Sequence, residues 1–136
     1  MIQYKTGNDL NLDALIELYK ASTLGERRPI DDRARMASML RHANLVVSAW
    51  DGDLLVGVSR ALSDFSFVTY LSDLAVRQSH QKQGIGKELI RRTQALAGKH
   101  AKLLLLAAPA AEKYYPHVGF THHPQAWMLN PDERVR

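Results

Sequence analysis

The sequence predicts an α/β (α+β) fold, in which a mixed, mainly antiparallel sheet of six to seven strands carries helices on both faces. The expected elements follow the order β, α, α, β, β, β, α, β, α, β, β along the chain. Early strands joined by short turns indicate antiparallel pairs, whereas the strand, helix, strand order in the middle indicates a crossover. The chain has 136 residues, 46% of them apolar and 24% charged, so we expect residues 1–136 to form a single domain.

The N-terminal part is expected to contain one strand and two helices. Ile2 to Thr6 has the pattern of a short strand, and apolar residues then recur at helical spacing from Leu12 to Tyr19. A second helix is expected to begin after Asp31 or Asp32, because a carboxylate suits an N-cap, and to end around His42.

The next part predicts strands only. Leu45 to Trp50 and Leu54 to Leu62 are β-rich runs on either side of Asp51-Gly52-Asp53, and an Asp-Gly turn between such runs indicates a hairpin. Phe67 to Val76 is expected to form the following strand. These strands supply the antiparallel part of the predicted sheet.

The last part predicts two helices and three strands. A polar turn over Arg77 to Gly86 leads into a helix, and Lys102 to Ala108 is a continuous apolar run, typical of a strand covered on both faces. The residues of the helix expected to face the core are Ile85, Leu89, Ile90, Leu96 and Ala97. Ala110 to His117 is expected to form a short helix, and Phe120 to His123 and Trp127 to Leu129 the final strands.

Composition excludes several kinds of site and location. The chain has no cysteine, which excludes a disulfide, a cysteine-ligated metal and a cysteine nucleophile. His122 and His123 would point to opposite faces of a strand, so no metal site is predicted. The longest apolar stretch is far shorter than the roughly 20 residues that cross a bilayer, and the N-terminus has no signal-peptide pattern. We therefore expect a cytoplasmic protein without membrane contacts.

The positive charge of the chain is concentrated in one segment. The formal net charge is +4 and the isoelectric point is about 9.5, which favours anionic partners. Between Arg77 and His100 six Lys or Arg residues stand against one acid, Glu88. A local site for an anionic group is the interpretation that fits this clustering.

The segment Leu74 to Lys87 carries the most information about chemistry. Its strand runs into a polar turn that opens a helix, and such a turn presents unpaired backbone amides to an anion. Gly84 and Gly86 have no side chain to keep a phosphate away from the main chain, and the helix dipole adds partial positive charge. The segment therefore predicts a cradle for a pyrophosphate.

Two familiar nucleotide motifs do not fit this turn. A P-loop requires an earlier glycine where Gln81 stands, and Ser or Thr where Glu88 follows Gly86-Lys87. A dinucleotide fingerprint requires Gly or Ala where Leu89 stands, and a shorter turn after the strand.

The turn instead resembles the signature of the GNAT superfamily of acyl-CoA N-acyltransferases, Q/R-x-x-G-x-G/A. The matching residues are Gln81-Lys82-Gln83-Gly84-Ile85-Gly86, and they follow Leu74-Ala75-Val76, the strand ending that the family places before the signature. Tyr114-Tyr115-Pro116-His117-Val118-Gly119-Phe120 resembles the family's F-Y-x-x-x-G-F box. The resemblance covers roughly residues 45 to 130 and implies a GNAT-like fold.

The resemblance implies acetyl-CoA as co-substrate and assigns roles to particular residues. The amides of residues 83 to 87 would hold the pyrophosphate, Leu74 and Val76 would bind the pantetheine arm through main-chain bonds, and Tyr115 would point at the thioester sulfur. Pro116 departs from the box, and proline restricts the backbone of the residue before it, which here is Tyr115. The implied cofactor-binding residues are Leu74, Ala75, Val76, Gln81, Lys82, Gln83, Gly84, Ile85, Gly86 and Lys87.

The general base has no motif of its own. Asp73 is the first candidate because it lies beside the central strand motif, followed by Asp64, Glu112, His80 and His117. With no cysteine and no serine in a nucleophile elbow, the amine is expected to attack the thioester directly.

The acceptor is left undetermined, because loops that recognise amines, such as Leu24 to Pro29, follow no sequence code. The implied partners are acetyl-CoA and a primary amine, with no nucleic acid, no membrane and no metal, and a homodimer is left open. The alternative is a catalytically silent acyl-CoA sensor, or a nucleic-acid accessory domain, with the same fold.

Overall fold

The computed structural model describes all 136 residues, and they form two compact parts. The first part is Met1–Leu106 and the second is Ala107–Arg136. The sheet and the three long helices belong to the first part.

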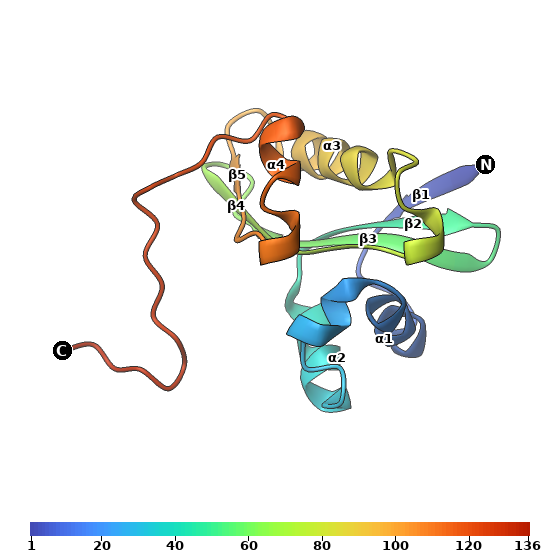
Figure 1. The fold of residues 1–136 in the computed structure, drawn as a ribbon, viewed down its shortest axis with the longest axis horizontal. Coiled ribbons are helices and arrows are strands. Elements are labelled where there is room, and N and C mark those ends of the chain that lie inside the picture. Colours follow the sequence, from blue (N-terminus) through green and yellow to red (C-terminus); the bar gives the residue numbers. More distant parts are fainter. The chain divides into compact units, whose positions relative to one another are not determined.

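The first part is built on one mixed sheet with the strand order β1-β2-β3-β4-β5 (Figure 1). The first three pairings are antiparallel and the pairing of β4 with β5 is parallel, as the sequence predicts. The β2–β3 turn is the predicted Asp-Gly turn, in which Gly52 has a φ of 61°. The strands are β1(Ile2–Thr6), β2(Leu45–Asp51), β3(Leu54–Ser63), β4(Val68–Val76) and β5(Lys102–Leu104).

The prediction of six to seven strands was wrong, because the sheet has five. The run from Lys102 to Ala108 is a strand only as far as Leu104, and neither Phe120 to His123 nor Trp127 to Leu129 forms a strand. Residues 121–130 are all exposed, with Trp127 at 95%. An apolar pattern shows strand propensity, whereas a strand also needs a neighbour to accept its backbone hydrogen bonds and a surface to cover one face.

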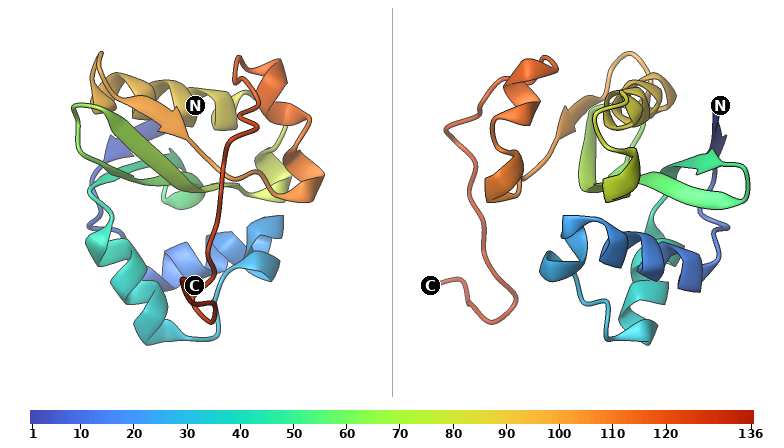
Figure 2. Two further views of the ribbon diagram at one scale, coloured as in Figure 1. Left: turned by 90° about the vertical axis from the view of Figure 1, so that its left-hand side faces the viewer. Right: turned by 45° about the vertical axis from the view of Figure 1, so that its right-hand side comes forward.

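Helices cover both faces of the sheet, as predicted. α1(Leu12–Ala21) and α2(Arg33–His42) lie on one face and α3(Ile85–Ala97) on the other, which the two views of Figure 2 show. Side chains cap the first two helices, since Asn11 accepts from the amide of Ala14 and Asp32 from that of Arg35. None of the helices is long and apolar enough to span a membrane.

Each face of the sheet has its own apolar cluster. Between α1, α2 and the sheet lie Leu15, Ile16, Leu18, Tyr19, Met36, Leu40, Ala43, Val46, Leu55, Val58 and Ala75. Between α3 and the sheet lie Val47, Ala49, Val56, Ile85 and Leu89, with Leu74 and Val76 packed beside them. Successive residues at the end of β4 thus face opposite clusters, as the pleat requires.

One core position of α3 was predicted incorrectly. Leu96 is 44% exposed, whereas Thr93 is fully buried. The Thr93 hydroxyl donates to the Leu89 carbonyl and lies 2.7 Å from the Ser59 hydroxyl of β3, so its polar atom is satisfied inside the core. Because Thr93 is polar, the apolar pattern of the sequence did not mark it as a residue that faces the sheet.

The second part contains one turn of 3₁₀ helix, Pro109–Ala111, and the short α4(Tyr114–His117). The predicted helix over Ala110 to His117 is therefore interrupted. Pro116 is the third residue of α4, where the missing amide hydrogen costs no intrahelical bond. Gly119 follows with a φ of 106°, which ends the helix.

We expect Leu89→Ala to lower the free energy of unfolding by about 2–5 kcal/mol, because it leaves a cavity beneath α3. Leu96→Ala is the matched control on the same helix, and a loss below about 1 kcal/mol is expected there because the side chain is half exposed. Urea denaturation measures both values. Equal losses in the two variants would contradict this account of the core.

Candidate functional site

The C-terminal half of β4 has one edge without a neighbouring strand. β4 pairs with β3 as far as Val76, but its pairing with β5 ends at Tyr70. The Arg77 amide donates to the Val56 carbonyl of β3 at 2.8 Å. Because successive amides of a strand point to opposite sides, those of Val76 and Leu74 point toward the open edge. A ligand with amide groups could pair there as a strand would.

The N-terminus of α3 presents amides that no side chain caps. Gly84 is the N-cap residue, with a φ of 82°, and the first helical bond runs from the Glu88 amide to the Gly84 carbonyl. The amides of Ile85, Gly86 and Lys87 therefore have no partner within the helix, and no side chain accepts from them, in contrast to α1 and α2. Such an end has the donors and the dipole that an anion requires.

The turn itself leaves space for a ligand. Gly84 has left-handed backbone geometry, and a Cβ added there would meet no atom within 4 Å. Lys82 also has a positive φ, 65°, in the same turn. These residues fit a pyrophosphate, because glycine keeps the main chain accessible and the turn leads directly into the uncapped N-terminus of α3.

Side chains hold this turn against the sheet. Gln81 donates from Nε2 to the Val76 carbonyl at 3.0 Å, which joins the turn to the end of β4. His80 Nε2 lies 2.9 Å from a carboxylate oxygen of Asp51, at the end of β2. The hydrogen bond from His80 lowers the pKa of Asp51. His80, a candidate base in the sequence, is therefore engaged in holding the turn.

A second anchor lies where β4 ends. Arg77 donates to both carboxylate oxygens of Glu17, at 2.7 and 2.8 Å, and to the Leu55 carbonyl at 2.9 Å. The hydrogen bond from Arg77 is the main cause that lowers the pKa of Glu17. The start of the turn is thus tied to α1 and to β3.

The charge around the turn is positive. Glu88, the single acid of the segment, is bound by Arg91 and Arg92 on the next helical turn, and these hydrogen bonds lower its pKa. Lys82 and Lys87 are exposed and belong to none of the ion pairs of the structure. Positive charge therefore lies beside the turn for which the sequence predicts a local anion site.

Asp73 lies on β4 but is enclosed by partners. Its carboxylate accepts from Arg28 Nε at 2.5 Å, from Arg60 Nε at 2.5 Å and from the Tyr19 hydroxyl at 2.6 Å, and its side chain is completely buried. Burial alone would raise the pKa of Asp73, but the bonds and charges from Arg60, Tyr19 and Arg28 outweigh it and hold the pKa below its usual value.

These contacts argue against Asp73 as the base that removes the amine proton. A carboxylate with a lowered pKa holds a proton weakly, and one with no exposed surface is out of reach of a substrate. Asp64 is also engaged, because it accepts from the amides of Ser66, Phe67 and Val68. Hydrogen bonds from these amides lower its pKa.

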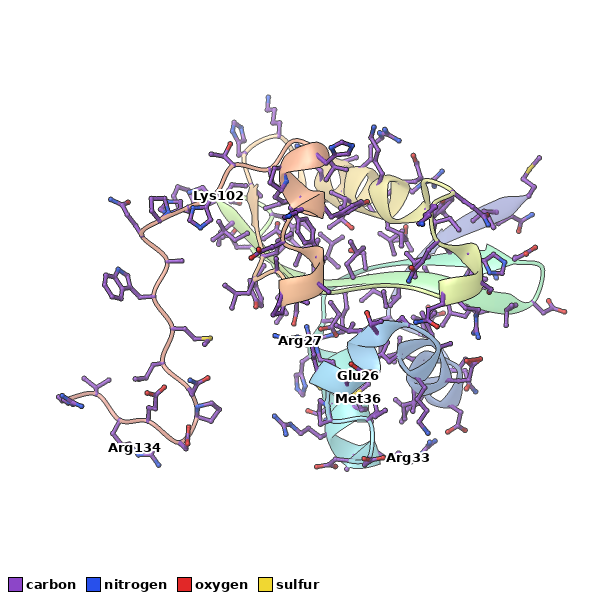
Figure 3. All side chains as sticks on the ribbon, in the orientation of Figure 1. Glu26, Arg27, Arg33, Met36, Lys102 and Arg134 are labelled. Atoms are coloured by element: carbon purple, nitrogen blue, oxygen red, sulfur yellow. The ribbon has the colours of Figure 1, made fainter.

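A cavity of about 260 Å³ lies beside the segment that joins α1 to α2. Its residues come from the end of α1, from the 3₁₀ segment Thr23–Arg27 and from the start of the turn after β4. Figure 3 labels Glu26 and Arg27 on this segment, which precedes α2. The lining residues are Lys20, Ser22, Thr23, Gly25, Glu26, Ile30 and Gln78. The loop that the sequence singled out for an acceptor therefore lines a cavity.

Tyr115 belongs to the second part of the chain, in α4. Its ring contacts those of Tyr114 and Phe120 edge to face, with ring centres 5.4 Å apart in both pairs. The Tyr115 carbonyl accepts from the amides of Val118 and Phe120 at 3.1 and 3.0 Å. The segment that resembles the family box thus forms one compact aromatic turn, which ends at Gly119.

Sequence reasoning missed the partners of Asp73. Arg60 offered a signal that it is ion-paired, since a charged residue stands inside an apolar strand, but not that Asp73 is its partner. Tyr19 and Arg28 offered none, because one looks like a core aromatic of a helix and the other like a basic loop residue.

Solved structures share this fold. A probable acetyltransferase from meticillin-resistant Staphylococcus aureus has 21% identity and a TM-score of 0.79, covering 96% of this chain and 98% of that one. A GNAT family acetyltransferase from Streptococcus pneumoniae has 25% identity and a TM-score of 0.69, covering 95% and 98%. The aminoglycoside N-acetyltransferase AAC(6')-Iy, solved in complex with CoA, has 18% identity and a TM-score of 0.75, covering 97% and 95%.

The sequence also matches a protein family over most of its length. The matching family is described as Acetyltransferase (GNAT) domain, and the match spans residues 23–127. The span includes β4, the turn after it, α3 and the box around Tyr115. Because the match covers well over half of the chain, the protein belongs to the GNAT acetyltransferase family.

Proposed function

We propose that the protein transfers the acetyl group of acetyl-CoA directly to a primary amine. The observation that carries the proposal is the junction of two unsatisfied backbone surfaces within the first part of the chain. The open edge of β4 runs into the turn that ends at the uncapped N-terminus of α3. An extended ligand with amides along its length and a pyrophosphate at one end has the shape and chemistry that both surfaces require.

The residues of the turn would bind the phosphates. The amides of residues 83 to 87 would donate to the pyrophosphate, with the exposed side chains of Lys82 and Lys87 close in sequence. Gln81 supports this role indirectly, since its amide group is bound to the Val76 carbonyl and fixes the turn.

The residues of β4 would orient the pantetheine arm and its acyl group. The amides of Leu74 and Val76 point to the open edge, and Ala75 between them packs into the core cluster under α1 and α2. We assign to the amide near Val76 the task of polarising the carbonyl that the amine attacks. When bound, acetyl-CoA supplies an activated thioester whose carbon–sulfur bond breaks as the new carbon–nitrogen bond forms.

Tyr115 is proposed as the hydrogen-bond donor to the leaving sulfur, on the strength of the family box that contains it. A thiolate with a conjugate-acid pKa of about 8.5 is a weaker base than a phenolate at about 10, so complete proton transfer would cost about 2 kcal/mol. A hydrogen bond to the developing thiolate needs no such transfer. The hydroxyl would therefore act mainly as a donor in the transition state.

The amine must lose a proton before or during attack, because an alkylammonium ion with a pKa of about 10.4 has no free electron pair. Asp73 and Asp64 are both engaged in structural contacts. We therefore propose that water at the site, rather than a buried carboxylate, accepts the proton of the amine. The cavity beside Thr23–Arg27 is the proposed place of the acceptor.

Acetyl-CoA is expected to raise the melting temperature of the protein, and Gly84→Asp is expected to abolish the rise. The substitution places a negative charge in the turn where the phosphates would bind, so repulsion weakens affinity. At a ligand concentration 100 times the Kd, stabilisation of the wild type should be about 2.7 kcal/mol. Thermal unfolding with and without acetyl-CoA measures the effect, and calorimetric titration gives the affinity.

Two control variants separate charge from backbone strain in this experiment. Gly52 also has a positive φ, 61°, and space for a Cβ, so Gly52→Asp introduces comparable strain and charge in the β2–β3 turn, outside the proposed phosphate turn. Gly84→Asn keeps the size without the charge. Both should retain affinity better than Gly84→Asp. An unchanged affinity in a folded Gly84→Asp protein would overturn the placement of the phosphates.

Tyr115→Phe is expected to lower kcat about 10-fold to 100-fold, the effect of losing one hydrogen bond to a developing charge, about 1.5–3 kcal/mol. The affinity for acetyl-CoA should change little, because the bond matters only in the transition state. Tyr114→Phe is the matched control in the same helix. A thiol-release assay over a panel of amines gives kcat, and calorimetric titration gives the affinity for acetyl-CoA. If the wild type binds acetyl-CoA but releases thiol with no amine of the panel, the result favours the alternative of a catalytically silent acyl-CoA sensor.

Direct transfer predicts that both substrates are bound together before any product leaves. Initial-rate plots at several fixed amine concentrations should therefore give intersecting lines in double-reciprocal form. The rate should rise with pH as the amine loses its proton, and then level off. Parallel lines, or an acetylated protein that passes its label to amine after CoA is removed, would require a nucleophile such as Ser72, Ser79 or a histidine.

A further inference from the structure

The segment Thr23–Arg27 lines the cavity but has no buried residue of its own. Leu24 is only partly buried against the core, and Gly25 packs closely on the end of α1, where an added Cβ would lie 2.7 Å from the Tyr19 carbonyl. A segment with so little apolar burial needs another contact to keep one conformation.

Arg28, the next residue, supplies that contact. Its Nε lies 2.5 Å from Asp73 Oδ1, and its Nη2 donates to the Ser72 carbonyl at 2.7 Å. Its Nη1 donates back to the Arg27 carbonyl at 2.8 Å, so the guanidinium also binds the end of the segment. One side chain thus joins the cavity segment to two adjacent residues of β4.

The place where Arg28 binds is an irregularity in β4. Arg60 of β3 pairs with Asp73 and Ala61 pairs with Leu71, which leaves Ser72 as an extra residue in β4. The bulge lies just beyond Tyr70, where the pairing with β5 ends and the open edge begins. Arg28 therefore fixes the cavity segment at the start of the proposed pantetheine edge.

Asp73 is held in place from its other side. Arg60 Nε lies 2.5 Å from Asp73 Oδ2, and the same guanidinium donates to the Ser72 hydroxyl at 2.8 Å and to the Met39 carbonyl of α2 at 3.1 Å. The Tyr19 hydroxyl of α1 donates to Asp73 at 2.6 Å. The carboxylate is thus a fixed point that Tyr19 of α1, Arg60 of β3 and Arg28 all bind, and Arg60 extends the network to α2.

We propose that Arg28 and Asp73 are positioning residues, whose ion pair fixes the segment Thr23–Arg27 in the conformation that shapes the acceptor cavity. The inference rests on the proposed function for the identity of the cavity's ligand, but the clamp itself is a property of the free protein. Neither residue needs to touch the reacting atoms.

The experiment compares Arg28→Ala with Arg27→Ala, its neighbour, whose exposed side chain enters no ion pair of the structure. Hydrogen exchange of the backbone amides of residues 23 to 28 is measured in the free protein. We expect exchange to be at least about 10-fold faster in Arg28→Ala and unchanged in Arg27→Ala, because the first loses the clamp and the second does not.

Steady-state kinetics supply the second readout. For Arg28→Ala we expect the KM for the amine to rise about 10-fold, while the affinity for acetyl-CoA changes less than about 3-fold, because only the acceptor cavity is disordered. Arg28→Lys keeps the charge but not the fork that reaches both Asp73 and Ser72. It should give intermediate exchange and intermediate KM, and it remains informative if Arg28→Ala does not fold.

The outcomes separate the two proposals. Wild-type exchange in folded Arg28→Ala and Arg28→Lys would overturn the clamp. Faster exchange with an unchanged KM for the amine would overturn the link to the acceptor. If the wild type acetylates no amine, the proposed function fails and the acceptor role fails with it, whereas faster exchange in Arg28→Ala would still support the clamp.

Discussion

β4 pairs with β3 along almost its whole length, but with β5 only from Val68 to Tyr70, and the half of β4 beyond that point keeps one edge open. This parting of two parallel strands is the constraint from which the rest of the site follows. An open edge inside a sheet leaves backbone groups, here the amides of Leu74 and Val76, without a strand partner, which is costly unless water or a ligand binds them. The same stretch ends in the turn before α3, so the unpartnered backbone amides of β4 are followed along the chain by those at the N-terminus of α3.

The buried cluster around Asp73 stabilises the strand at the place where β5 leaves it. Removing a carboxylate from water costs several kcal/mol, and two guanidinium groups and a phenol offset that cost by filling its hydrogen-bonding positions. Burial and the nearby carboxylate raise the pKa of the Tyr19 phenol, which therefore keeps its proton and donates. The cluster fixes helices and strands in one arrangement because each partner comes from a different element.

The three long helices differ in how they begin, and the difference has a functional meaning. α1 and α2 have the side-chain caps of Asn11 and Asp32, each worth about 1 kcal/mol, whereas α3 begins at Gly84 without one. The protein forgoes that stabilisation at the one helix whose first amides face the proposed phosphate site. The free protein thus lacks the stabilisation of a cap at this helix end, and a ligand bound there would supply it.

Local patterns in the sequence determined much of this protein. The Asp-Gly hairpin, the two capped helices, the strand ending at Val76 and the glycine turn before α3 were all predicted, because turn geometry and helical periodicity depend on residues close together in the chain. Only the tertiary structure decided the partners of Asp73, which lie 13, 45 and 54 residues away. It also decided that β5 ends at Leu104 and that Phe120 to His123 and Trp127 to Leu129 form no strands, because a strand exists only where a neighbour accepts its hydrogen bonds, and no local pattern records which neighbour is present.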